Sequence, residues 1–356
     1  MVGCGRIAMA HAAALRFLAD DGEVALVAAA DPDPDGVAQV VAIAGEGVRS
    51  GSDGYSVIED PDVDAIVLTA PTRLHRDYIA AVADAGKPLF TEKPLAPTYA
   101  VVREIVDVVA AAGIPAQVGF QSRFHPIVRR VREMVASGEH GAPMAYTLRD
   151  DQFWPTGSVV PGHTSWRSDR AQAGGGALLE HSIHSCDVLG WMFGPVTRIY
   201  AATRSVFGFD VEDTATLTIE HASGVIGNLV TVFNGVQHRE ERRLEVFFER
   251  ASVEMTTDFI VGAPEDSLLV HRGDDEHALR HDPADVLRAA FIADGVDPDR
   301  QFYVYQYLAY RSFVAAVRAG HAPVPGMADA QHAHAMVEAA YRSASARRPV
   351  DLSELD

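Results

Sequence analysis

MVGCGRIA, residues Met1–Ala8, opens the chain and contains a G-x-G-x-x-A pattern that leads into a helical run from Ile7 to Leu18. The glycines of this pattern allow a tight turn and a close backbone approach to a pyrophosphate, which then lies at the helix N-terminus. The pattern alone has low specificity, so its surroundings decide its meaning. An apolar strand from Val24 to Ala30 follows the helix, as a βαβ unit requires. The stretch therefore predicts a dinucleotide-binding domain.

Asp31 ends that strand. An acid at this position accepts hydrogen bonds from the adenosine ribose and repels a 2′-phosphate, so we expect NAD as the cofactor and NADP to be less favoured. The alternative interpretation of Asp31 is a turn residue in its Asp-Pro-Asp-Pro sequence. Only Met1 and Val2 precede Gly3, whereas a strand usually has about 5 or 6 residues. We therefore expect the natural chain to begin several residues earlier.

Strand and helix patterns alternate through the first third of the chain. We expect strands at 65–69, 88–91 and 115–119, and helices at 74–85 and 99–112. This alternation predicts a parallel, doubly wound sheet with right-handed crossovers. Ligands bind at the carboxyl ends of such strands, where Gly3, Asp31, Pro71 and Lys93 all fall.

Composition limits the possible partners. The 356 residues suffice for two domains. The formal net charge of −19 argues against nucleic acid and anionic membrane as partners, because both repel an acidic surface. No 18-residue apolar run or signal-peptide layout occurs, so we expect no membrane association. The cysteines, Cys4 and Cys186, form no disulfide framework, which fits the cytoplasm.

A second informative stretch is Gly174–Gly194, GGGALLEHSIHSCDVLGWMFG, whose apolar content predicts one buried helix. Glu180, His184 and Asp187 are spaced i, i+4 and i+7, so they share one stripe of that helix. Buried ionisable groups are costly unless they are paired or used. The stripe therefore favours a catalytic face, and the alternative is a polar cluster that braces the core.

A metal site in the same stretch is disfavoured, and we expect no metal. His181 and Cys186 point away from the stripe that holds His184 and Asp187, and no second Cys/His cluster has matching ligand spacing. Beyond this helix, strand-like runs separated by turn signals indicate antiparallel pairing. These runs are at 198–206, 214–220, 225–233, 243–248 and 252–255, after an earlier one at 143–153.

Lys93 lies in the sequence Glu92-Lys93-Pro94, directly after a strand. A lysine so placed can polarise or protonate a substrate oxygen; the alternative is a surface lysine in a loop. With the glycine fingerprint, residues 71–75 and the glycine-led helix, this motif resembles the glucose–fructose oxidoreductase and inositol dehydrogenase family (Gfo/Idh/MocA). The resemblance covers essentially the whole chain. It extends to residues 121–126, 166–167, 212–215 and two closing helices, at 302–319 and 329–344.

The resemblance implies an α/β protein with an NAD-binding Rossmann domain at 1–119 and a substrate-binding and oligomerisation domain at 120–356. The first domain has a doubly wound parallel sheet. The second has an open, mostly antiparallel sheet, whose outer face commonly makes a homodimer or homotetramer interface. The C-terminal helices are expected to pack back toward the first domain. Family members oxidise a ring hydroxyl of a sugar or cyclitol, or reduce the matching ketone.

The resemblance also implies roles for individual residues. Lys93 contacts the reacting oxygen, His184 is the acid/base group, and Glu180 stands where the family usually has Asp. The cofactor-binding residues are expected to be Gly3, Gly5, Arg6, Ile7, Ala8, Asp31, Pro71, His75, Glu92, Lys93 and Gln121. The substrate-binding residues are expected to be Lys93, Arg123, Trp166, Arg167, Glu180, His181 and His184, and Trp154 also suits a sugar ring.

The sequence therefore predicts a cytoplasmic, homo-oligomeric, NAD-dependent dehydrogenase of a sugar, cyclitol or related polyol. Two alternatives stay open. One is an enzyme that retains NAD and cleaves a glycoside by transient oxidation and elimination. The other is a non-catalytic, nucleotide-binding sensor, which the presence of both Lys93 and His184 disfavours.

Overall fold

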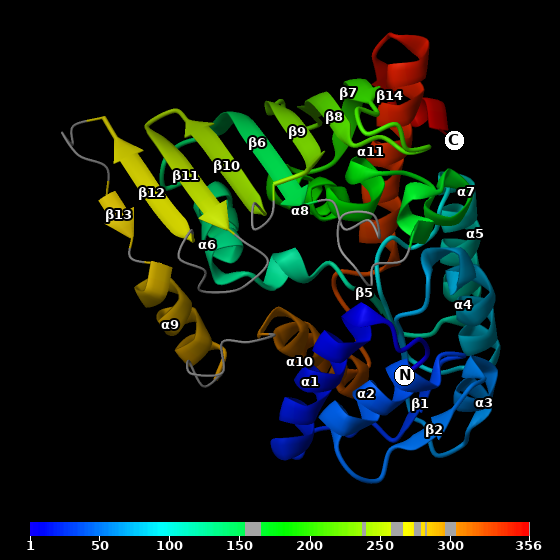
Figure 1. The fold of residues 1–356 in the computed structure, drawn as a ribbon. Coiled ribbons are helices and arrows are strands. Elements are labelled where there is room, and N and C mark those ends of the chain that lie inside the picture. The colour runs from blue at the N-terminus through cyan, green and yellow to red at the C-terminus, as the bar shows by residue number, and fades with distance from the viewer. Residues whose placement is uncertain are drawn as a thin grey trace. The chain divides into compact units, whose positions relative to one another are not determined.

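The computed structural model describes residues 1–153, 165–236, 240–257, 266–273, 279–281, 283–295 and 304–355 (Figure 1). Two compact units divide the chain. The first comprises Met1–Gln121 and Tyr303–Gln331, and the second comprises Ser122–Phe302 and His332–Asp356. Two predicted features, Trp154 and the beginning of the helix expected at 302, lie outside the described residues.

The first unit is built on short parallel strands. The strands are β1 (Ala28–Ala30), β2 (Arg49–Gly51), β3 (Ile66–Leu68), β4 (Leu89–Thr91) and β5 (Ala116–Val118). They form one two-stranded group, β1-β2, and one three-stranded group, β3-β4-β5. All but β2 are buried along their whole length. Burial on both faces is typical of parallel strands that are covered by crossover helices.

The first three residues of the chain supply the central position of this sheet. Val2 makes parallel bridges to Ala30 on one side and to Leu68 on the other. The Gly3 N–H donates to the Ala30 carbonyl at 2.9 Å, and the Val2 N–H donates to the Val67 carbonyl at 2.8 Å. The segment therefore joins the two strand groups into one parallel layer, as the doubly wound prediction requires.

Helices alternate with these strands; those expected at 74–85 and 99–112 are present, and two more between β1 and β3 were not predicted. The helical elements of this unit are α1 (Arg6–Asp20), α2 (Pro34–Ala44), α3 (Gly54–Glu59), the 3-10 turn η1 (Thr72–Leu74), α4 (His75–Asp84), α5 (Tyr99–Ala112) and α10 (Val304–Ala319). The bounds of α5 follow from its sequence. The Thr98 hydroxyl caps its N-terminus, and Gly113, with φ of 65°, ends it in the left-handed conformation.

The second unit contains a large, mostly antiparallel sheet, as predicted. Among the described residues its strand order is β13-β12-β11-β10-β6-β9-β8-β7-β14, and only β6 and β9 pair in parallel. The strands are β6 (Pro143–Phe153), β7 (Val196–Arg204), β8 (Thr214–His221), β9 (Ile226–Asn234), β10 (Glu241–Phe248), β11 (Ala251–Thr257), β12 (Ser267–Arg272), β13 (Leu279–His281) and β14 (Val350–Asp351).

One face of this sheet is covered and the other is open. Burial alternates along β8, where Leu217 and Ile219 are buried while Thr216 and Thr218 are exposed. Figure 1 shows helices on the covered side. The remaining helical elements are η2 (Gln121–Phe124), α6 (Pro126–Ser137), η3 (Ser165–Ser168), α7 (Arg170–Ala173), η4 (Ala177–His181), α8 (Ile183–Phe193), α9 (Pro283–Ala293), α11 (Met327–Ala346) and η5 (Leu352–Leu355).

The prediction of one continuous helix over Gly174–Gly194 is wrong. A single π-helical turn, η4, precedes α8, and Ser182 separates the two. The segment starts on Glu212, whose carboxylate accepts the backbone N–H groups of Gly176 and Leu178 at 2.9 and 3.0 Å. Only glycine fits at 176, because a Cβ there would lie 1.8 Å from the Glu212 carbonyl oxygen. A distant carboxylate therefore holds the start of the segment, a constraint that helical periodicity does not contain.

Candidate active site

The glycine-rich turn of the first unit is shaped for close backbone approach. Gly3 has φ of 93°, and a Cβ on it would lie 2.5 Å from the Ala70 backbone nitrogen. Gly5 differs, because a Cβ there would meet nothing within 4 Å, and no side chain caps the N-terminus of α1 behind it. Gly5, Arg6 and Ile7 are exposed, whereas Ala8 is buried. The helix N-terminus is therefore accessible to an anionic group.

Asp31 links this turn to the end of β1. Its Oδ2 accepts the Cys4 N–H at 2.7 Å, and its Oδ1 accepts the Asp33 N–H at 2.8 Å. A carboxylate has about four lone-pair sites, so these two bonds leave acceptor capacity for ribose hydroxyls. Burial and Asp31 raise the pKa of the Cys4 thiol to about 11, so this thiol stays protonated beside the turn.

Glu92 anchors the Lys93 backbone at the end of β4. Its Oε2 accepts the Lys93 N–H at 3.1 Å, and its Oε1 lies 3.0 Å from His11 Nε2. The other ring nitrogen of His11 lies 2.6 Å from the Tyr310 hydroxyl. Burial and Glu92 hold the pKa of Tyr310 well above its usual range, so this hydroxyl stays protonated beside the His11 ring.

The other predicted cofactor residues also lie after strands. Pro71 precedes η1 at the end of β3, and Gln121 follows β5. His75 is buried, with Nε2 2.9 Å from the Ala70 carbonyl and Nδ1 3.2 Å from the Leu95 carbonyl. Burial lowers the pKa of His75, which favours the neutral ring. The structure therefore gathers these residues at the carboxyl ends of the parallel strands.

In the second unit, three of the predicted substrate-binding side chains lie together. The Arg167 Nε donates to Glu180 Oε2 at 3.1 Å, and the Arg167 guanidinium lies 4.6 Å from the centre of the Trp166 ring. Glu180 and His184 are 6% and 1% exposed, and they occupy the π-helical turn and the first turn of α8. An indole with a guanidinium and a carboxylate suits the apolar face and the hydroxyls of a sugar.

Arg123 and Asp187 form a buried ion pair. Arg123 donates through Nε to Oδ2 at 2.7 Å and through Nη2 to Oδ1 at 2.5 Å. The Arg123 guanidinium also lies 5.4 Å from the centre of the Trp191 ring. Asp187 therefore serves as a partner of arginine within the stripe that it was predicted to share with Glu180 and His184.

His181 lies against an acid that the sequence analysis did not identify. Its Nε2 is 2.8 Å from Asp150 Oδ1, and both side chains are almost fully buried. Arg242 lies across the strand pair from Asp150 and belongs to the same cluster. The sequence does mark Asp150 as unusual, because aspartate is depleted in strands and Asp150 lies inside the strand expected at 143–153.

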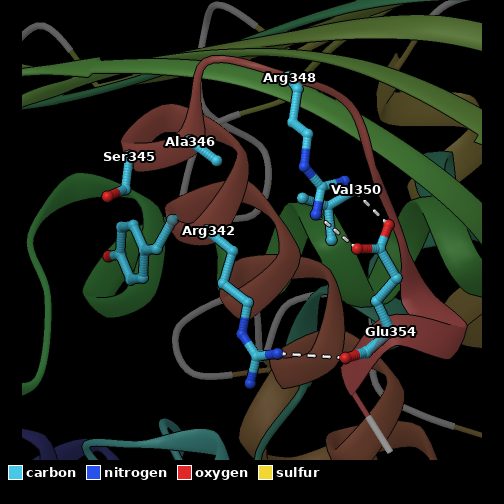
Figure 2. A pocket seen from close by; sticks show the side chains of 7 residues that line it. Arg342, Ser345, Ala346, Arg348, Val350 and Glu354 are labelled. Atoms are coloured by element: carbon cyan, nitrogen blue, oxygen red, sulfur yellow. Dashed lines mark hydrogen bonds and ion pairs between the residues drawn. The ribbon is translucent and has the colours of Figure 1, made fainter.

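Within the described part of the chain, no group of three or more His, Cys, Asp or Glu side chains is arranged to hold a metal ion. A cavity of about 460 Å³ lies at the end of α11, and it contains none of the predicted site residues. Figure 2 shows its arginines, Arg342 and Arg348, directed at Glu354. Arg348 pairs with the Glu354 carboxylate, whereas Arg342 donates to the Glu354 backbone carbonyl.

The glycine-rich turn, the acid after β1 and the parallel sheet define a dinucleotide-binding oxidoreductase fold. Comparison with known families agrees. Residues 1–120 match the model described as "Oxidoreductase family, NAD-binding Rossmann fold", and residues 128–254 match the "GFO/IDH/MocA C-terminal domain". The chain belongs to the Gfo/Idh/MocA oxidoreductase family. The family, the fold class and the NAD-binding character predicted from the sequence are thereby confirmed.

Curated relatives align over most of the chain. Scyllo-inositol 2-dehydrogenase (NAD(+)) of Bacillus subtilis (strain 168) is 27% identical over 333 residues, which cover 91% of this chain and 87% of that protein. Myo-inositol 2-dehydrogenase of Thermotoga maritima is 25% identical over 364 residues, which cover 100% of this chain and 98% of that protein.

Solved structures share the fold. A levoglucosan dehydrogenase in complex with NADH and levoglucosan has a TM-score of 0.86 and 23% identity, and the match covers 99% of this chain and 98% of that chain. An oxidoreductase domain protein from Kribbella flavida has a TM-score of 0.86 and 22% identity, with 99% and 97% covered. In the described residues, no helix has the length and hydropathy needed to span a bilayer.

Proposed function

We propose that the protein is an NAD-dependent dehydrogenase that acts on a ring hydroxyl, or reduces the matching ketone, of a sugar, cyclitol or related polyol. The observation that carries this proposal is the placement of buried His184 and Glu180 on one segment, with Arg167 bound to Glu180 and stacked on Trp166. The names of the two inositol dehydrogenases that resemble the chain support a polyhydroxylated ring as substrate.

The residues of the first unit fit a dinucleotide. Gly3 lets the turn lie against the Ala70 backbone, and Gly5 leaves the approach to the α1 N-terminus clear, so the pyrophosphate would lie there. The Asp31 carboxylate would accept hydrogen bonds from the adenosine ribose and would disfavour NADP, so NAD is the preferred cofactor. When bound, the nicotinamide supplies the hydride acceptor or donor.

His184 and Lys93 carry the proton chemistry of the proposed reaction. In the oxidation direction, His184 removes the hydroxyl proton, and the Lys93 ammonium donates a hydrogen bond to the same oxygen. The C–H bond of that carbon breaks and its hydrogen leaves as hydride, so a C=O bond forms. In the reduction direction, His184 returns the proton to the oxygen.

Glu180, Trp166 and Arg167 bind and orient the substrate in this proposal. The Trp166 ring stacks on the apolar face of the sugar, and the Arg167 guanidinium donates to hydroxyls while Glu180 fixes its orientation. Because the Arg167 side chain is 37% exposed, it is accessible to a ligand. Correct orientation reduces the barrier by aligning the reacting groups before the chemical step.

The open face of the large sheet is the proposed homodimer or homotetramer interface. Large apolar side chains are exposed at the outward-facing, alternating positions of β7, β9 and β10, and they are Tyr200, Ile226, Val230 and Phe247. Exposed apolar surface of this kind is typical of protein–protein contacts. Light scattering with size-exclusion chromatography measures the mass; a strictly monomeric protein at micromolar concentration contradicts the interface.

Absorbance of reduced nicotinamide tests the function. The purified protein is mixed with NAD or NADP and with a panel of cyclitols, aldoses, anhydrosugars and glycosides. The proposal expects absorbance to increase with NAD and at least one polyol. No signal with any compound, together with NAD released only on denaturation, supports the glycoside-cleaving alternative. No signal with any compound, together with reversible binding of added NAD, supports the nucleotide-binding sensor.

A further inference from the structure

Asp150 receives hydrogen bonds from three side chains of the segment that carries Glu180 and His184. His181 Nε2 lies 2.8 Å from Oδ1, while the hydroxyls of Ser182 and Ser185 lie 2.8 and 2.5 Å from Oδ2. All three donors are buried, and none of them belongs to the predicted proton chemistry. Their convergence on one carboxylate is a specific contact between this segment and the sheet.

The sheet in turn fixes Asp150. In the strand register Asp150 lies opposite Arg242 on β10 and opposite Thr231 on β9. The Arg242 guanidinium makes three contacts. Its Nη2 lies 3.4 Å from Asp150 Oδ1. Its Nε and Nη1 donate to the hydroxyls of Ser185 and Ser122, each at 3.1 Å. Arg242 therefore holds the carboxylate and the helix simultaneously.

The charge of Asp150 is stabilised in this buried position. Burial alone would raise its pKa, but Arg242, His181 and the Ser185 hydrogen bond together hold the pKa well below its usual range. The carboxylate is thus ionised at all working pH values. A charge-assisted acceptor of this kind holds its donors more strongly than a neutral group does.

The contacts are made at the place where the helix geometry changes. Ser182 separates the π-helical turn from α8, and its hydroxyl lies 2.8 Å from Asp150 and 2.6 Å from the Thr231 hydroxyl. Glu180 precedes this junction and His184 follows it. The angle between the two helical pieces therefore determines how these two side chains are directed relative to each other.

We propose that Asp150 is a positioning residue, which pins the junction at Ser182 to the sheet and thereby sets the orientation of Glu180 and His184. The inference rests on the proposed function, since it assigns its effect to the His184 proton transfer. A displacement of about 1 Å in such a group can cost about 10²-fold in rate. In this proposal the buried members of the cluster act through Glu180 and His184.

Asp150→Asn tests the proposal, because it keeps the size of the side chain and removes its charge. Asp151→Asn is the matched control: it makes the same change at the next residue of β6, whose carboxylate pairs with Arg149 instead. We expect Asp150→Asn to lower kcat about 10²-fold and to shift the acid limb of the pH profile of kcat. NAD affinity, measured by fluorescence, stays within about twofold of wild type. Asp151→Asn stays within about twofold of wild type in kcat.

His181→Gln and Ser185→Ala are the second set, because they retain the Asp150–Arg242 pair if Asp150→Asn does not fold. We expect each of these variants to lower kcat about tenfold or more. Their melting temperatures should stay within a few degrees of wild type. Full kcat in a folded Asp150→Asn protein overturns the proposal, as does full kcat in both of the milder variants.

Amide hydrogen exchange separates this proposal from the proposed function, because it requires no substrate. Exchange in the segment 177–186 is expected to accelerate in Asp150→Asn and His181→Gln, while exchange in α5 stays unchanged. Unchanged exchange in 177–186 overturns the positioning role. Faster exchange there, combined with a wild-type protein that turns over no polyol, retains the anchoring role and rejects the proposed reaction.

Discussion

The Arg123 guanidinium binds the Asp187 carboxylate with two hydrogen bonds, of 2.7 and 2.5 Å, at a site from which water is largely excluded. Removing one partner of a buried ion pair leaves an uncompensated charge, which costs about 3–5 kcal/mol of stability. Arg123→Met is therefore expected to reduce the free energy of unfolding by that amount. The double variant Arg123→Met/Asp187→Leu is expected to lose less than Arg123→Met alone.

Urea unfolding of the two single variants and the double variant measures this coupling. Strictly additive losses would contradict the ion pair. If Arg123→Met retains its stability and only the KM for the polyol increases, Arg123 acts directly on the substrate, as the resemblance to the family implies.

Gly5→Ala is expected to separate cofactor affinity from stability. A Cβ at this position meets no atom within 4 Å, and the backbone φ of −73° is ordinary for alanine. The melting temperature should stay within a few degrees of wild type. The added methyl group lies where a pyrophosphate would approach the helix, so NAD affinity should fall by about tenfold or more, equivalent to about 1.4 kcal/mol. Titration of intrinsic fluorescence with NAD measures this; undiminished affinity would contradict the proposed pyrophosphate site.

Asp31→Asn is expected to weaken the discrimination against NADP. The substitution removes the negative charge and keeps an acceptor for the Cys4 or Asp33 N–H. Relief of charge repulsion with a 2′-phosphate should narrow the ratio of kcat/KM for NAD over NADP by about tenfold, or about 1.4 kcal/mol. Steady-state kinetics with NAD and with NADP, at one ionic strength, measure the two kcat/KM values in wild type and variant. A ratio that stays the same in the variant argues against Asp31 as the determinant.

His125 is expected to contribute to acid sensitivity. Its Nδ1 caps α6 by accepting the Ile127 N–H, and burial and Arg242 lower its pKa to about 3, although Asp266 lies 3.7 Å from Nε2. The unfolded chain has a histidine pKa near 6.5 and so binds more protons between about pH 6.5 and 3. The free energy of unfolding therefore decreases as the pH falls from about 6.5 to 3 because of His125. Above about pH 6.5 this residue causes no such decrease.

His125→Asn retains a capping acceptor and removes the titrating ring. The free energy of unfolding of the wild type should fall more steeply below pH 6 than that of the variant, by about 1.4 kcal/mol per pH unit. Denaturant melts at pH 7, 6 and 5 compare the two slopes. Parallel slopes would mean that His125 binds protons equally in the folded and unfolded protein, which contradicts a lowered pKa.

Local sequence signals predicted the parts of the fold that local physics determines. The helix at 99–112 coincides with α5, because Thr98 and Gly113 fix both of its ends. The strand at 143–153 coincides with β6. In contrast, the segment Gly174–Gly194 is not one helix, and its start is bound by Glu212, which lies 36 positions further along the chain. No periodicity within a helix reports such a partner.

The candidate site also contains residues that local sequence patterns indicated and partners that those patterns did not indicate. The sequence identified the segment that carries Glu180 and His184, and it identified Glu92-Lys93-Pro94. It did not identify His11, which meets Glu92 across 81 positions, or Asp150, which meets His181 across 31. These partners come from other elements, so only tertiary structure brings them together.

The kcat of Lys93→Ala and His184→Asn tests the central claim most directly, with reduced nicotinamide followed by absorbance on the best polyol of the panel. Positioned acid–base groups contribute about 10²–10⁴-fold. The proposed roles therefore predict a loss in that range for each variant, with a melting temperature within a few degrees of wild type as evidence of folding. A loss below about tenfold in either folded variant would contradict the role of that residue in the proton chemistry.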